Sequence, residues 1–144
     1  APQATHARIN LQFALQTKGD LEGCARLGRE HAQTAPTPTL SAALALTGLQ
    51  CALDAPESAA WAKPAIEPFE SLLRPMLKEP TLNPDDLAGV YETLIGAREA
   101  AKDDPGALAL AKDWLTAMKQ AQANAKSSAA RAARSLRGNS ARRA

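Results

Sequence analysis

Residues 39–54 read TLSAALALTGLQCALD and are apolar on nearly every side of a helix. Five leucines recur in this stretch at helical spacing, so it is expected to form the most buried helix of its domain. Thr39 or Ser41 is the expected N-cap, because either hydroxyl can accept a hydrogen bond from a free N–H of the first turn. Asp54-Ala55-Pro56 ends the helix, since the residue before a proline is steered out of the helical conformation.

The composition of the whole chain points to the same class. Its length of 144 residues is typical of about one domain, and 45% of the residues are hydrophobic. Of the 65 hydrophobic residues 33 are Ala and 19 are Leu, whereas only three are Ile and one is Val. Strands draw on β-branched and aromatic residues, whereas Ala and Leu favour helices. The sequence therefore predicts an all-α protein, and it contains no apolar run of about 18 residues that would span a membrane.

Caps, breakers and apolar spacing place about six helices. The first should turn Ile9, Phe13 and Leu15 inward, and the short turn at Gly19-Asp20 makes an antiparallel hairpin with the second. The fourth contains three prolines and is predicted to be bent, split into two pieces, or shortened to begin near Ile66. The expected segments are residues 5–18, 21–33, 40–53, 58–78, 84–102 and 106–124.

A weak internal repeat relates the second and sixth segments. Residues 23–31 (GCARLGREH) and 106–114 (GALALAKDW) align at an offset of 83, and each follows an acidic turn. Chance similarity between Ala-rich helices is the alternative explanation. A single helix hairpin cannot bury its apolar face alone, but stacked hairpins form one continuous core. We therefore expect antiparallel helix pairs stacked as an αα-solenoid, with its concave face formed by the first helix of each pair.

Charge divides the chain unevenly. Residues 1–113 carry 10 Lys and Arg against 15 Asp and Glu, whereas residues 114–144 carry seven bases and no acid. We expect a helical-repeat domain over residues 1–126 and a flexible basic C-terminal tail over 127–144, either disordered or a frayed helix. A solvated tail is one interpretation of this basic block. The alternative is binding to nucleic acid or a membrane surface through Arg131, Arg134, Arg137, Arg142 and Arg143.

Three stretches resemble the tetratricopeptide-like helical region of bacterial exported thioredoxin-family proteins. They are GDLEGCA (19–25), LTGLQCAL (46–53) and YETL (91–94) with AREAA (97–101), and the likeness covers roughly residues 5–133. The resemblance implies a non-catalytic scaffold that binds a protein or peptide, as an accessory module of a larger exported protein. No Cys-x-x-Cys motif and no thioredoxin domain are present in this sequence, so thiol-disulfide activity is not carried over. The basic ending after residue 133 also departs from the family pattern.

The two cysteines, Cys24 and Cys51, fall on the inner faces of the second and third segments. A bridge between them is expected, with two buried free thiols as the alternative. The chain begins at Ala1, which suggests a processed form or a piece of a longer protein. Together with the resemblance this favours a periplasmic or secreted location, and reduced cysteines would favour the cytoplasm instead.

The remaining candidate residues suggest no reaction. Trp61, Tyr91 and Trp114 can anchor a partner, although each recurs with leucines at helical spacing, which favours core packing. Asp85-Asp86 and Asp103-Asp104 are explained as a helix start and a turn. We therefore expect no enzyme activity, no cofactor and no metal, and the sequence specifies neither the partner nor the oligomeric state.

Overall fold

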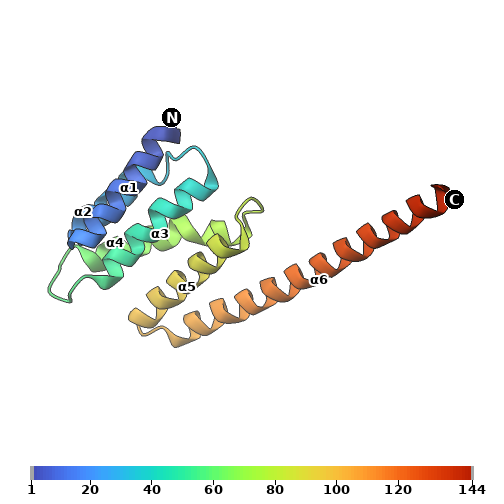
Figure 1. The fold of residues 1–144 in the computed structure, drawn as a ribbon. Helices are drawn as coiled ribbons and strands as arrows, with labels where there is room; N and C mark the ends of the chain where they lie inside the picture. Colours follow the sequence, from blue (N-terminus) through green and yellow to red (C-terminus); the bar gives the residue numbers. More distant parts are fainter. Residues whose placement is uncertain (1, 144) are drawn as a thin grey trace. The chain divides into compact units, whose positions relative to one another are not determined.

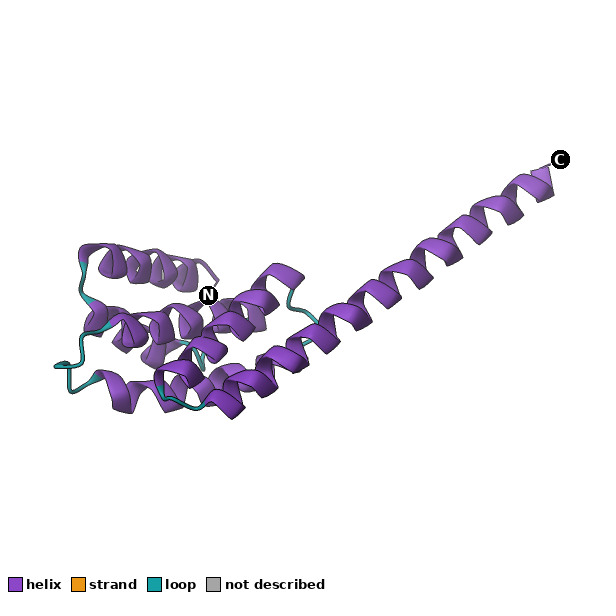
Figure 2. Ribbon diagram, turned by 90° about the horizontal axis from the view of Figure 1, so that it is seen from below, coloured by secondary structure: helices purple, strands orange, loops and turns teal. Residues whose placement is uncertain are grey.

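The structure is a computed structural model that describes the backbone of residues 2–143 and the side chains of residues 2–139. Over that range every regular element is a helix, as expected (Figure 2). The chain divides into two compact units, Ala1–Leu110 and Ala111–Ala144, each described separately below. The elements are α1 (Pro2–Lys18), α2 (Leu21–His31), α3 (Pro38–Asp54), α4 (Ala62–Leu73), the 3-10 helix η1 (Arg74–Lys78), α5 (Pro84–Ala100) and α6 (Asp104–Arg143).

Helix α3 lies at the centre of the first unit. It contacts α1, α2, α4 and α5, and Leu44, Leu49 and Cys51 on it are fully buried (Figure 1). This confirms that residues 39–54 form the most buried helix. The expected cap was wrong: Thr37 accepts from the Leu40 N–H at 3.2 Å, so the helix starts at Pro38. Proline suits this first position because its ring presets the helical φ and its missing N–H has no partner to lose there.

The inward face expected for α1 was only partly right, because Ile9 and Leu15 are partly buried but Phe13 is not. Phe13 is 49% exposed, whereas Gln12 beside it is fully buried. The Gln12 side-chain amide donates to the carbonyl oxygens of Cys24 (3.2 Å) and Leu44 (2.9 Å). This bridge joins α1 to α2 and α3. Gly28 makes room for it, since a Cβ at that position would lie 2.9 Å from the Gln12 amide nitrogen.

The proline-rich fourth segment is split into two pieces, as predicted. Helix α4 ends at Leu73 and continues as η1 with Pro75 in its first turn, while Pro68 lies inside α4. Pro75 has no N–H to give to the helical ladder, so the α-helical pattern gives way to 3-10 geometry there. Gly48 of α3 allows close packing against this region, because its missing Cβ leaves space for the ring of Phe69.

The two sequences that align at an offset of 83 are each preceded by a turn of the same conformation. Gly19 and Lys102 both take the left-handed conformation, with φ of 93° and 58°. The next residue in each case is an aspartate that caps the following helix and closes the turn by a backbone bond. The capping bonds are accepted by Asp20 Oδ1 from Gly23 N–H and by Asp103 Oδ1 from Gly106 N–H. The bonds that close the turn are donated by Asp20 N–H to Leu15 O and by Asp103 N–H to Arg98 O.

In the second unit, helix α6 extends to Arg143 instead of fading near Asn124. Among its described side chains only Trp114 and Ala117 are partly buried, and the others are exposed. The physical reason for the continuous helix is the dense Ala, Lys and Arg content of residues 119–137, which have high intrinsic helix propensity and contain no proline.

Candidate functional site

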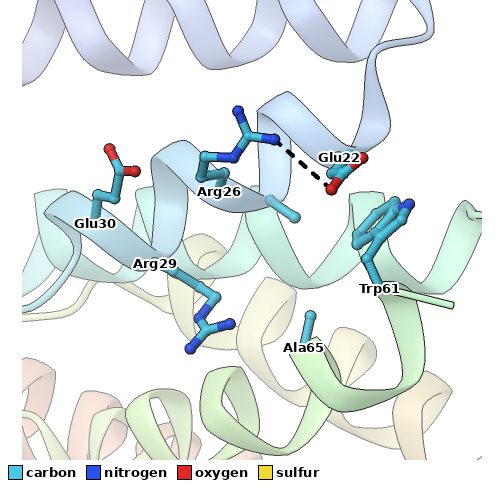
Figure 3. A pocket seen from close by; sticks show the side chains of 7 residues that line it. Glu22, Arg26, Arg29, Glu30, Trp61 and Ala65 are labelled. Carbon is cyan, nitrogen blue, oxygen red and sulfur yellow. Dashed lines mark ion pairs between the residues drawn. The ribbon is translucent and has the colours of Figure 1, made fainter.

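An open hollow of about 370 Å³ lies between α2 and α4 (Figure 3). Its lining combines charged side chains of α2 with an aromatic side chain at the start of α4. The lining residues are Glu22, Ala25, Arg26, Arg29, Glu30, Trp61 and Ala65. Trp61, one of the aromatic residues that the sequence proposed as partner contacts, is the aromatic residue among them.

Local sequence signals place both walls of this hollow. Asp20 caps α2 through the Gly23 N–H at 2.9 Å, which sets the start of the helix that carries Arg26 and Arg29. Trp61 immediately precedes the first residue of α4. Ala25 and Ala65 are buried and have short side chains. Small side chains at a helix contact leave space above them, so the longer residues around them form the rim.

The two arginines of α2 differ in their surroundings. Arg26 pairs with Glu22 at 3.7 Å, four residues away on the same helix, with both side chains more than half exposed. Arg29 points from α2 toward α4, across Ala65 from the ring of Trp61 (Figure 3). Among the described residues Arg29 takes part in none of the ion pairs. Among the described residues no carboxylate therefore forms an ion pair with the Arg29 guanidinium, which lines the hollow.

This arrangement suits recognition of a carboxylate that lies next to an apolar group. A guanidinium binds a carboxylate through two parallel hydrogen bonds, and an indole ring supplies a rigid apolar surface. Among the described side chains no group of three His, Cys, Asp or Glu is placed to hold a metal ion.

A second polar cluster joins α4, α5 and the turn before α6. Glu70, only 5% exposed, accepts from Arg98 Nε (2.8 Å) and Nη2 (2.6 Å), and Arg98 Nη1 reaches Asp103 at 3.3 Å. The hydrogen bond to Glu70 is the main reason that the pKa of Arg98 is raised. Donation from the Gly106 N–H, followed by that from Arg98, lowers the pKa of Asp103 below its ordinary 3.8. Both oxygens of Glu70 are occupied by one guanidinium, so the cluster is a structural clamp.

The bridge between Cys24 and Cys51 is present, as expected. It joins α2 to α3 with a Cα–Cα distance of 6.3 Å, and both residues are fully buried. Cys24 neighbours Ala25, so the bridge holds the helix that carries one wall of the hollow. A disulfide in the core fits an oxidising compartment.

The other predicted site residues lie on α5 and α6. Tyr91 is 4% exposed and belongs to the core. Trp114 is partly buried on α6, and Arg131, Arg134 and Arg137 are exposed there. The side chains of Arg142 and Arg143 lie outside the described residues.

Sequence reasoning missed Arg29, Glu70 and Arg98. Arg29 gains its importance from Trp61, which lies 32 positions further along the chain, and Glu70 pairs with Arg98 across 28 positions. No local pattern marks such pairs. The polarity of Glu70 in an otherwise apolar helix face was the one available signal.

Comparison of the chain with models of protein families, with curated proteins and with solved structures finds no match. Among the described residues no helix is both long enough and apolar enough to cross a membrane.

Proposed function

We propose that this protein is a non-catalytic helical-repeat scaffold that binds a protein or peptide, and that it serves as an accessory module of an exported thioredoxin-like protein. The main support for the scaffold proposal is that α3 contacts four other helices, α1, α2, α4 and α5. A helix with that many helical neighbours is characteristic of the first helix of a middle pair in a stack of helix pairs.

The other helix contacts agree with a tetratricopeptide-like stack. Consecutive helices α1 and α2 contact each other, as do α3 and α4, and the alternate helices α1, α3 and α5 contact in turn. In such a stack each pair touches only the adjacent pairs. The turn that recurs 83 residues apart further supports a repeated helix–turn–helix unit.

The hollow between α2 and α4 is the proposed docking place. Its ligand would be an extended or helical peptide that presents an Asp, Glu or C-terminal carboxylate to Arg29 and an adjacent apolar side chain to Trp61. Burial of one apolar side chain contributes roughly 1.5–3 kcal/mol, and a hydrogen bond to a charged group adds about 1.5–3 kcal/mol. Contacts of this size suit a weak, reversible interaction.

An array of immobilised peptides that vary in acidic and aliphatic content tests this proposal. We expect retained peptides to combine a carboxylate with Leu, Ile or Phe nearby. Trp61→Ala and Arg29→Gln should each weaken binding of the best peptide about tenfold, equivalent to about 1.4 kcal/mol. Arg74→Gln is the matched control, because this exposed arginine lies outside the lining of the hollow. Equal binding by wild type and Trp61→Ala, or no acidic preference, would refute the assignment.

The proposed export rests on two supports. The buried bridge fits an oxidising compartment, and the resemblance to exported thioredoxin-family proteins points the same way. Sequencing the coding region on both sides of this chain tests the module proposal. A neighbouring thioredoxin-like domain would support it, and an uninterrupted gene for a cytoplasmic protein would argue against it.

Anion binding by the C-terminal helix is a second proposal. Its support is that Arg131, Arg134 and Arg137 are all exposed on α6. If three to five of the candidate arginines contact phosphates, the observed association constant for duplex DNA should fall as salt rises. A plot of its logarithm against the logarithm of salt concentration should have a slope of about −2.7 to −4.5. Titration of a labelled DNA duplex at several salt concentrations measures this slope, and the absence of binding at low salt would exclude the proposal.

A further inference from the structure

Helix α6 presents an apolar row and a basic row along its described length. The basic row consists of Lys112, Lys119 and Lys126, which lie seven residues apart and are all exposed. The apolar row follows heptad spacing beside it and is interrupted by Gln122. Its members are Ala111, Leu115, Met118, Ala125, Ala129, Ala132 and Leu136, and its three large side chains are all at least half exposed.

A solvent-exposed helix with this pattern is typical of a docking surface. Heptad spacing keeps side chains on one face over several turns, and small residues let a second helix approach closely. The basic row also indicates the charge of the partner. Between residues 111 and 139 the helix carries six Lys and Arg against one acid, Asp113, so the partner surface should be acidic.

Helix α5 of the same protein carries a surface of matching chemistry. Asp85, Glu92 and Glu99 also lie seven residues apart and are all exposed, on the side of α5 opposite the buried Val90 and Leu94. Beside this acidic row lies Gly96, where an added Cβ would have no atom within 4 Å. The outward face of α5 therefore combines a line of carboxylates with room for close approach.

The two rows match in spacing as well as in charge. Seven residues of helix rise about 10.5 Å, so three lysines on one helix and three carboxylates on another can align along their whole length. Pairing of α6 with α6 would instead bring two strongly basic helices together, and like charges repel. Among the described helices, the acidic face of α5 is the complement that this charge pattern favours.

We propose that α6 of one copy docks along the outward face of α5 of a second copy, so that the protein self-associates through alternating lysine and carboxylate rows. The apolar row of α6 would be covered in the same contact. This proposal concerns a different surface from the α2–α4 hollow and does not depend on the peptide-binding proposal.

The mass of the full chain in solution tests the proposal, by light scattering coupled to size exclusion and by sedimentation equilibrium. At low salt we expect species of twice the 15.1 kDa chain mass or more, with a mass that rises with protein concentration. At about 1 M salt, where the Debye length falls to about 3 Å, the dissociation constant should rise at least about tenfold.

Charge reversal supplies the specific test. The variants K112E/K119E/K126E and D85K/E92K/E99K should each be monomeric at low salt, and an equimolar mixture of the two should associate again. The matched control K18E/K63E/K78E changes the charge by the same amount at exposed lysines outside α6 and should still associate. Circular dichroism of each variant checks that helicity is retained.

Three results would overturn the proposal. They are a monomer at low salt at every concentration, a K112E/K119E/K126E variant that self-associates like wild type, and a mixture of two helical variants that stays monomeric. Association that appears only after DNA is added would equally reject a second copy as the partner.

Discussion

Loss of the Cys24–Cys51 bridge should destabilise the first unit by a predictable amount. The bridge closes a loop with a sequence separation of 27. In the chain-entropy model this restricts the unfolded chain by about 12 cal/mol/K, or about 3.5 kcal/mol at about 25 °C. Both cysteines are fully buried, so reduction also leaves two thiols in a core where neither can be hydrated. We therefore expect reduction to lower the free energy of unfolding by at least this amount.

Urea unfolding followed by far-ultraviolet circular dichroism measures the effect. With an m-value of about 1.5 kcal/mol/M, a loss of 3.5 kcal/mol lowers the urea midpoint by about 2 M. The reduced sample should be refolded from denaturant with reductant present, because a bridge in the core is protected in the folded protein. Cys24→Ala/Cys51→Ala should behave like the reduced wild type or be less stable. Equal midpoints for oxidised and reduced protein would refute the reasoning, as would two alkylatable thiols in protein isolated without reductant.

Three further predictions address packing and pH. Gly48→Ala should cost about 1–3 kcal/mol in a urea titration, because its Cβ would lie 2.6 Å from the ring of Phe69. Gly96→Ala should stabilise α5 by about 0.5–1 kcal/mol in the same assay, since its Cβ would meet nothing within 4 Å; a loss of stability would contradict this. Asp103→Asn should lower the thermal midpoint near neutral pH and match wild type in strong acid. The lowered pKa of Asp103 stabilises the fold above the ordinary value of 3.8, and this contribution disappears as pH falls through the lower folded value, so a pH-independent difference would contradict the assignment.

Much of the helical architecture could be predicted from local signals. The balance of Ala and Leu over β-branched residues predicted the all-α class, and the three prolines of the fourth segment predicted that it would be bent or divided. The helix start predicted at Asp85-Asp86 is present, and Asn83 caps it by accepting from the Asp86 N–H at 2.8 Å. Local prediction worked here because capping and chain breaking depend on atoms only a few residues apart.

The candidate site was predicted only in part. Trp61 was named as a partner contact, but Arg29 opposite it was not. On α1 the apolar spacing suggested that Phe13 faces inward, and instead Gln12 does so, because two backbone carbonyls of neighbouring helices satisfy its amide. The sixth helix was expected to fade after about Asn124 because little beyond it can be buried. Instead α6 continues to Arg143, since helix propensity needs no buried face to extend an existing helix.

The sequence by itself determined the all-α class, the positions of the main helix breaks and turns, and the separation of acidic and basic residues along the chain. These properties depend on bonds and steric contacts within one or two turns of backbone. Only the tertiary structure decided which face of α1 is buried, which carboxylate Arg98 satisfies, and that Arg29 and Trp61 border one hollow. Such pairings depend on how the helices rotate and approach one another, which is set by packing among residues tens of positions apart.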